Sequence, residues 1–133
     1  MARGALRKGL LWVAAVGALA CAAAPAMAQG ANPGLLKFWT TCGACHTLDT
    51  SGGHSKGPNL WALFGKQLGA IEKFATYSAP MRAAAARSIV WTEETLDRWL
   101  QNPQAMVPGN EMEFALDNAQ DRADVIGFLR TQR

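Results

Sequence analysis

Apolar side chains recur at helical spacing in four stretches of the chain, all of them after residue 28. The first stretch is predicted to begin with Asn32 as N-cap and Pro33 at the first helical position, which is a typical pair at a helix start. One side of this helix is expected to be apolar and to face a core, because it carries Leu35, Leu36, Phe38 and Trp39.

Two further helices are predicted in the middle of the chain. One covers residues 79–86, with Ser78 as its cap. The other starts at Thr92 and ends before Pro103, because a proline ring disfavours helix at the residue before it. The apolar face of this longer helix is expected to contain Leu96, Trp99 and Leu100.

The last predicted helix begins at Asn118, where Asp121 is placed to help cap it. Its buried face is expected to contain Val125, Phe128 and Leu129. Residues 47–57 are rich in Gly, Ser, Thr and Asp and are predicted to form a loop, and no segment alternates like a strand for long. The predicted fold class is all-α, with short helices and long loops. A domain this small buries little apolar surface by itself, so we expect a large flat apolar cofactor at its centre.

The first 28 residues have the pattern of a secretory signal peptide. A basic start is followed by an apolar run over residues 10–24, and Ala26-Met27-Ala28 offers the small residues of a cleavage site. Cleavage after Ala28 divides the chain into a signal peptide, 1–28, and a domain, 29–133. The location that this pattern predicts is the periplasm.

Two alternatives to cleavage stay open. The apolar run could be retained as a membrane anchor, although it is shorter than the about 20 residues that a bilayer core needs. Alternatively, Cys21 could be acylated, as in a lipoprotein. After cleavage, no membrane span is expected in the mature protein.

The basic charge of the chain belongs to its first 28 residues. The chain has 13 Lys and Arg against 10 Asp and Glu, and three of the bases but none of the acids lie in that segment. Residues 29–133 therefore have balanced charge. Because no basic run interleaved with aromatic residues follows, binding of nucleic acid is not expected.

One motif carries a specific chemistry. Cys42-Gly43-Ala44-Cys45-His46 has the C-x-x-C-H spacing of covalent haem attachment. Two thiols one helical turn apart can each add to one vinyl group of the same porphyrin, and His46 then points at the iron as its proximal ligand. We therefore predict one haem c, bound through Cys42 and Cys45.

Three other interpretations of this motif explain less. A disulfide is usual for two exported cysteines, but it leaves His46 without a role. A thioredoxin-like redox pair needs a βαβ context, and a zinc site needs a second pair of ligands. Residues 29–133 contain no further cysteine and only one further histidine, His54.

Other short blocks follow the motif in a characteristic order. Together with the motif they resemble class I c-type cytochromes, in particular mitochondrial cytochrome c and its close bacterial relatives, from Gly34 to Leu129. The resemblance implies the class I cytochrome c fold, with short helices and long loops around one covalent haem, and an electron carrier that is not an enzyme. The blocks are Gly57-Pro58-Asn59-Leu60, Leu63-Phe64-Gly65, Trp91-Thr92, Leu100-Gln101-Asn102-Pro103, residues 107–112, Phe114 and residues 122–129.

The sixth iron ligand is expected among Met81, Met106, Met112 and His54. Met81 lies in a helical Ala-rich stretch, and Met106 precedes the Pro108-Gly109 turn. Met112 follows that turn, in a loop that can fold over the far face of a haem. The resemblance also selects Met112, and it implies that His54 ties loops together by hydrogen bonds.

The resemblance assigns further residues to the haem site. The carbonyl of Pro58 matches the one that accepts the N–H of the proximal histidine and fixes its tautomer. Trp91 and Tyr77 match residues that hydrogen-bond the haem propionates. Gly34 and Gly127 match small residues at which the terminal helices cross.

Several positions depart from the family pattern. Asn110 stands in place of a threonine near the methionine ligand, Trp99 in place of a tyrosine, and Lys66 in place of an arginine. Mitochondrial cytochrome c surrounds its exposed haem edge with lysines, which dock acidic partners. Most of these lysines are missing here, so the resemblance does not imply the same charge-based docking. Lys56 is retained, but the other matching positions are Thr41, Gln104, Ala105 and Glu111.

These observations predict a periplasmic, monomeric, monohaem cytochrome c that carries single electrons between a donor and an acceptor protein. Axial ligation by His46 and Met112 leaves no place for a substrate on the iron, so transfer is expected to be outer-sphere. Two alternatives stay open: a dedicated electron-accepting subunit of a periplasmic dehydrogenase, and a haem enzyme with an open sixth position.

Overall fold

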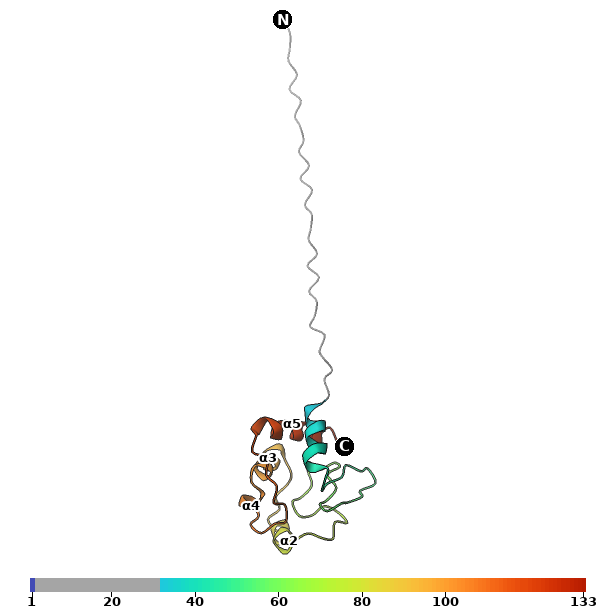
Figure 1. The fold of residues 1–133 in the computed structure, drawn as a ribbon, viewed down its shortest axis with the longest axis vertical. Helices are drawn as coiled ribbons and strands as arrows, with labels where there is room; N and C mark the ends of the chain where they lie inside the picture. The colour runs from blue at the N-terminus through green and yellow to red at the C-terminus, as the bar shows by residue number, and fades with distance from the viewer. Residues whose placement is uncertain (2–31) are drawn as a thin grey trace.

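The computed structural model describes Met1 and residues 32–133, so residues 2–28 of the predicted signal peptide, its cleavage point and Cys21 lie outside the described residues. Between residues 32 and 133 the chain is helical, with one isolated β-bridge between Gln67 and Val90 and no strand. The predicted all-α class is confirmed (Figure 1). The elements are α1 (Pro33–Lys37), the π-helical segment η1 (Phe38–Cys42), α2 (Ala79–Ala85), α3 (Glu93–Gln101), α4 (Pro103–Met106) and α5 (Ala119–Arg130).

The predicted helix starts are found, each with a side-chain cap. The Asn32 carboxamide accepts the Gly34 and Leu35 N–H groups at 3.0 and 3.2 Å. Each such bond satisfies a backbone donor that has no partner inside the helix. The predicted cap Ser78 of α2 acts in the same way, and so do the residues at the two other predicted starts, Thr92 for α3 and Asn118 for α5.

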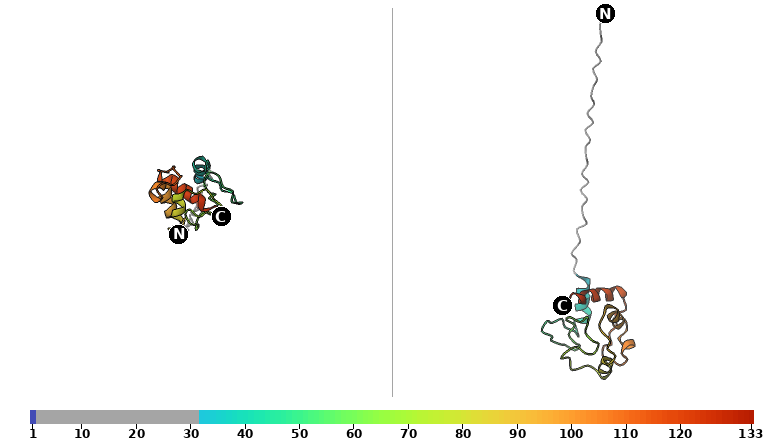
Figure 2. Two further views of the ribbon diagram at one scale, coloured as in Figure 1. Left: turned by 90° about the horizontal axis from the view of Figure 1, so that it is seen from below. Right: turned by 180° about the vertical axis from the view of Figure 1, so that it is seen from behind.

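The terminal helices pack against each other at one end of the molecule, whereas α2 lies at the other end (Figures 1 and 2). A Cβ built on Gly34 would lie 2.0 Å from the Asp124 carbonyl oxygen, so only glycine permits this approach of α1 to α5. Phe38 is fully buried beside Phe128, with ring centroids 5.6 Å apart. Gly127, which was expected at the same crossing, has nothing within 4 Å of its built Cβ, so that expectation is wrong.

The apolar side predicted for the first helix is only partly buried. Phe38 faces the core, but Leu35, Leu36 and Trp39 are 40%, 62% and 52% exposed. The reason is that α5 covers only one side of this helix. These three apolar side chains are therefore open to the solvent.

Arg122 of α5 is a buried cation that joins three segments. Its guanidinium donates to the Asp97 carboxylate of α3 at 2.7 Å and to the carbonyl oxygens of Leu116 and Asp117 at 3.0 and 2.8 Å. A buried charge is tolerated when it is paired and hydrogen-bonded in this way. The contact holds the segment before α5 against both helices.

The long loop between η1 and α2 is held by its own polar side chains. His54 accepts the Asn59 N–H on Nδ1 at 2.9 Å, and its Nε2 bonds the Glu72 carbonyl oxygen at 3.0 Å. This is the loop-tying role that the resemblance implied for His54.

In the described part of the chain, no helix has the length and apolar character that a membrane crossing requires.

Candidate functional site

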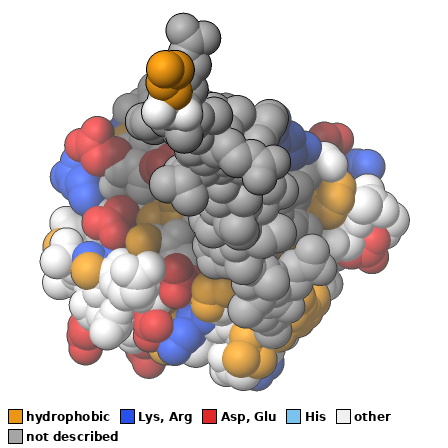
Figure 3. Space-filling view, turned by 90° about the horizontal axis from the view of Figure 1, so that it is seen from above, with side chains coloured by type: hydrophobic (Ala, Val, Ile, Leu, Met, Phe, Trp, Pro, Cys, Tyr) orange, Lys and Arg blue, Asp and Glu red, His pale blue; other side chains and the backbone are white. Residues whose placement is uncertain are grey.

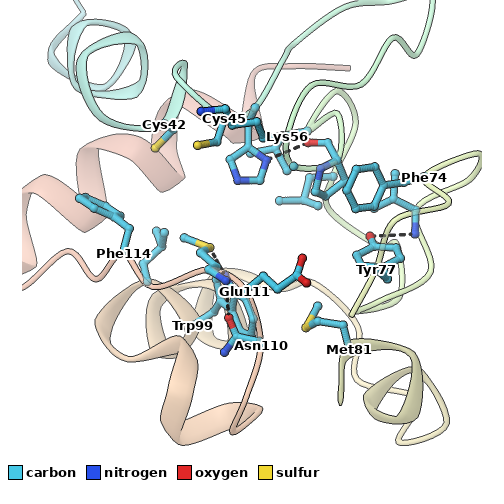
Figure 4. Close-up of a pocket in the computed structure, with 18 of the residues that line it drawn as sticks. Cys42, Cys45, Lys56, Phe74, Tyr77, Met81, Trp99, Asn110, Glu111 and Phe114 are labelled. Atoms are coloured by element: carbon cyan, nitrogen blue, oxygen red, sulfur yellow. Dashed lines mark hydrogen bonds between the residues drawn. The ribbon is translucent and has the colours of Figure 1, made fainter. Parts of the chain in front are cut away.

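A cavity of about 380 Å³ opens at the centre of the fold, within the usual range for cofactor sites. Its wall comes from η1, the long loop, α2, α3, α5 and the segment around Met112. Most of the lining side chains are apolar, as a core completed by a cofactor requires (Figure 4). The exposed Phe114 marks the mouth of this cavity.

One turn of chain presents the attachment motif to the cavity. Cys42 ends η1, and its carbonyl oxygen accepts the N–H groups of Cys45 and His46 at 3.0 and 2.9 Å. This turn places Cys42 and Cys45 side by side at one edge of the cavity (Figure 4). Both thiols are free, and burial raises the pKa of the Cys42 thiol. The two sulfurs are therefore available for bonds to a cofactor.

His46 is oriented by the chain that follows it. Its Nδ1 donates to the Pro58 carbonyl oxygen at 2.8 Å, which leaves Nε2 with a free lone pair for a metal. Burial lowers the pKa of His46, so the neutral, ligating form is favoured. A Cβ on Gly57 would lie 2.4 Å from the His46 ring, so glycine is needed there to leave room for the imidazole.

Met112 also lines the cavity, and its sulfur has a defined partner. The indole Nε1–H of Trp99 donates to the Met112 sulfur at 3.1 Å, and the Met112 N–H donates to the Asn110 side chain at 2.8 Å. Trp99 and Asn110 lie across the cavity from the two cysteines (Figure 4). Met81 lines the cavity as well, beside Tyr77, whereas the buried Met106 does not reach it.

Trp91 and Tyr77 are both buried in the cavity wall. Trp91 packs edge-on against Trp99, with ring centroids 5.7 Å apart. The Tyr77 hydroxyl accepts the Ile71 N–H at 3.3 Å and can still donate its own proton. Their roles towards haem propionates stay predictions.

These residues fit a haem. The cavity is apolar, two unpaired thiols share one edge, and a neutral imidazole lies beside them with Nε2 free. A covalently held haem supplies one-electron iron chemistry, and the protein supplies the ligands, the orientation and the dry environment. The fold and the site thus define a small helical protein of the c-type cytochrome class.

Comparison with known proteins gives the family. The family model described as cytochrome c matches residues 34–133. Cytochrome c of Gossypium barbadense is 43% identical over 108 residues, which cover 77% of this chain and 94% of the relative. Cytochrome c of Chlamydomonas reinhardtii is 44% identical over 94 residues, covering 70% of this chain and 80% of the relative. The chain belongs to the cytochrome c family.

Family membership confirms several sequence predictions. The protein is a monohaem electron carrier and not an enzyme, and its cofactor is one haem c bound covalently through the two cysteines of the motif. The disulfide, thioredoxin-like and zinc interpretations of Cys42 and Cys45 are thereby replaced.

The predicted location is wrong. The relatives from Gossypium barbadense, Sesamum indicum, Chlamydomonas reinhardtii and Ginkgo biloba are cytochromes c of plants and an alga. Such mitochondrial-type proteins act in the intermembrane space. They are not periplasmic proteins with a cleaved signal peptide, which is what the predicted cleavage after Ala28 implied. A basic start followed by an apolar run is typical of a targeting segment, but the pattern alone does not specify the compartment.

Three residues that shape the site were not predicted to contact the ligand residues or their loop. Gly57 makes room for the His46 ring, Trp99 holds the Met112 sulfur, and Gln104 bonds the loop that leads to Met112. Gly57 lies in one of the blocks that resemble the family, and Trp99 and Gln104 depart from the family pattern. Only the fold shows what each of them contacts.

Proposed function

We propose that the chain, folded as one monomeric domain over residues 29–133, carries single electrons between two redox proteins by outer-sphere transfer. His46 and Met112 are the two axial ligands of its haem iron in this proposal. The observation that carries it is that His46 and Met112 line one cavity, with the His46 ring held through its Nδ1 by Pro58 and the Met112 sulfur held by Trp99. With both axial positions filled, electrons pass at the cavity mouth, near Phe114.

The chain also favours the reduced iron. A thioether is a soft ligand that stabilises the ferrous state and raises the potential. The buried apolar wall, with Leu63, Leu100 and Val125, excludes water and lowers the local dielectric. A low dielectric favours the less charged state of the iron site, so ligand and wall act in the same direction.

The covalent link can be tested by mass. The denatured protein should have the mass of the polypeptide plus one haem, and acid acetone should extract no haem. Replacing both Cys42 and Cys45 with alanine should make the haem fully extractable, because no thioether bond then remains. Intact-mass spectrometry checks this. Extraction of haem from the unaltered protein would contradict the assignment.

The surface around the cavity mouth has little net charge. Thr41, Glu111 and Glu113 line the cavity together with a single cation, Lys56. Acidic and basic side chains are also interspersed on the end that carries α1 and α5 (Figure 3). We therefore infer that partners dock by apolar and polar contacts near Phe114, with weak electrostatic steering.

Weak steering predicts a weak salt dependence. The second-order rate constant for electron transfer with the native partner should change less than about threefold as the Debye length shrinks from about 30 to 10 Å. Stopped-flow measurements over that range of ionic strength check this. A fall of tenfold or more would show a charged docking face, which Lys37, Lys56, Lys66 and Lys73 are best able to build.

A second candidate function is that of a dedicated electron-accepting subunit of one dehydrogenase. The exposed Leu36 and Trp39 favour it, because a lasting contact buries such side chains. The two proposals differ in stoichiometry. A subunit should co-purify with one partner at equal molar amounts, whereas a diffusing carrier should elute alone as a monomer.

A further inference from the structure

We propose that Gln104, Asn110 and Trp99 are positioning residues that hold the Met112 thioether in place in both oxidation states of the iron. This inference rests on the proposed role of Met112 as the sixth ligand. A thioether is a weak ligand for ferric iron, so the time for which it stays bound depends on how firmly the protein holds it. The three side chains are called the Met112 clamp below.

Gln104 closes the turn that precedes Met112. Its Oε1 accepts the Gly109 N–H at 3.0 Å, and its Nε2 donates to the Asn110 carbonyl oxygen at 2.9 Å. Gly109 has a φ of +78°, a backbone conformation that favours glycine and makes the turn tight. A lysine, which the family resemblance leads one to expect at position 104, has no acceptor for the Gly109 N–H.

Asn110 links this turn to Met112 itself. The side chain is 5% exposed, and its Nδ2 donates to the Val107 carbonyl oxygen at 2.7 Å. Its Oδ1 accepts the Met112 N–H at 2.8 Å. One buried amide therefore fixes the backbone on both sides of the turn.

Trp99 holds the sulfur. The indole is 6% exposed, lies on α3 and donates its only N–H to the Met112 sulfur at 3.1 Å. A thioether sulfur has two lone pairs, so the second stays free to face the iron. Because an indole only donates, this bond directs the sulfur without competing for the metal. It also withdraws electron density from the sulfur, which favours ferrous iron.

The test uses the ferric holoprotein and imidazole as the entering ligand. Gln104→Met keeps the size of the side chain but removes both of its hydrogen bonds, so the limiting rate of imidazole entry should rise about fivefold or more. Gln101→Met, an exposed change at the end of α3, is the matched control and should leave the rate unchanged. The loss of the thioether-to-iron absorption band reports the exchange.

Trp99→Phe tests the bond to the sulfur separately. It should increase the rate of imidazole entry and shift the midpoint potential to lower values, since the sulfur becomes a stronger donor. Trp61→Phe, outside the cavity wall, should change neither. A purely packing role for Trp99 would alter stability but not the potential.

The outcomes separate the two proposals. If Met112→Ala opens the iron to imidazole while Gln104→Met and Trp99→Phe behave like the unaltered protein, the Met112 clamp is refuted and the ligand assignment stands. If Met112→Ala leaves the absorption band and the slow entry of imidazole unchanged, both proposals are wrong. Faster entry in the Gln104 and Trp99 variants, with no change in the controls, supports the clamp.

Discussion

Replacing Met112 with alanine should remove the sixth ligand and give the largest functional change of any single substitution. The thioether-to-ferric-iron absorption band should disappear. Cyanide or imidazole should bind faster than in the unaltered protein, because no thioether has to leave the iron first. The midpoint potential should fall by about 0.2 V, a part of the about 0.8 V over which axial ligands set haem potentials. Absorption spectroscopy and a redox titration of the holoprotein check these results.

Met81 and Met106 provide the controls for this substitution. Both are buried, but only Met81 lines the cavity, on the side where Tyr77 lies. Met81→Ala and Met106→Ala should lower stability by about 2–5 kcal/mol as core truncations and keep the absorption band. If the band is lost in Met81→Ala and kept in Met112→Ala, the ligand is Met81.

Gly34→Ala should be the most destabilising replacement of a glycine by alanine among residues 32–133. The new Cβ would lie 2.0 Å from the Asp124 carbonyl oxygen and 2.7 Å from the Phe128 Cβ, and neither atom belongs to the end of a flexible side chain. The terminal helices must therefore separate, at a cost of about 3 kcal/mol or more. Thermal unfolding of the holoprotein should show a Tm lower by more than about 12 °C.

Gly127→Ala is the matched control, because the same methyl group meets nothing within 4 Å. It lies within α5, where alanine is favoured over glycine by up to about 1 kcal/mol. Its Tm should be unchanged or higher by a few degrees. Equal losses in the two variants would show that α1 and α5 cross differently from the arrangement described.

Local signals were enough to locate most of the helices. The sequence predicts Asn32 and Ser78 as caps and Thr92 and Asn118 as helix starts, and each of the four side chains accepts a backbone N–H at its helix start. The short α4 was missed because four residues do not show a periodic pattern. Its Asn102 cap and Pro103 were nevertheless visible in the sequence as a start pair.

The candidate site was only partly predictable for a physical reason. The attachment motif is a local spacing, and Pro58, which bonds His46, lies in a short block that resembles the family. A sequence pattern can therefore reveal both of them. The bond from Trp99 to Met112 joins α3 to a loop, and no periodicity encodes it. The exposure of Leu36 depends on which side of α1 packs against α5, and the sequence of α1 alone does not determine this.

The buried Arg122 has a consequence for how the protein opens. Its guanidinium bonds hold α5, α3 and the carbonyls of residues 116–117, a few positions beyond Met112. If α5 separates from the rest of the fold, those carbonyls lose their hydrogen-bond donor, and the segment between Met112 and residue 117 becomes less firmly held. Fluctuations of the terminal helix and of the ligand loop should therefore belong to one cooperative unit, whose amide protons exchange with the solvent together.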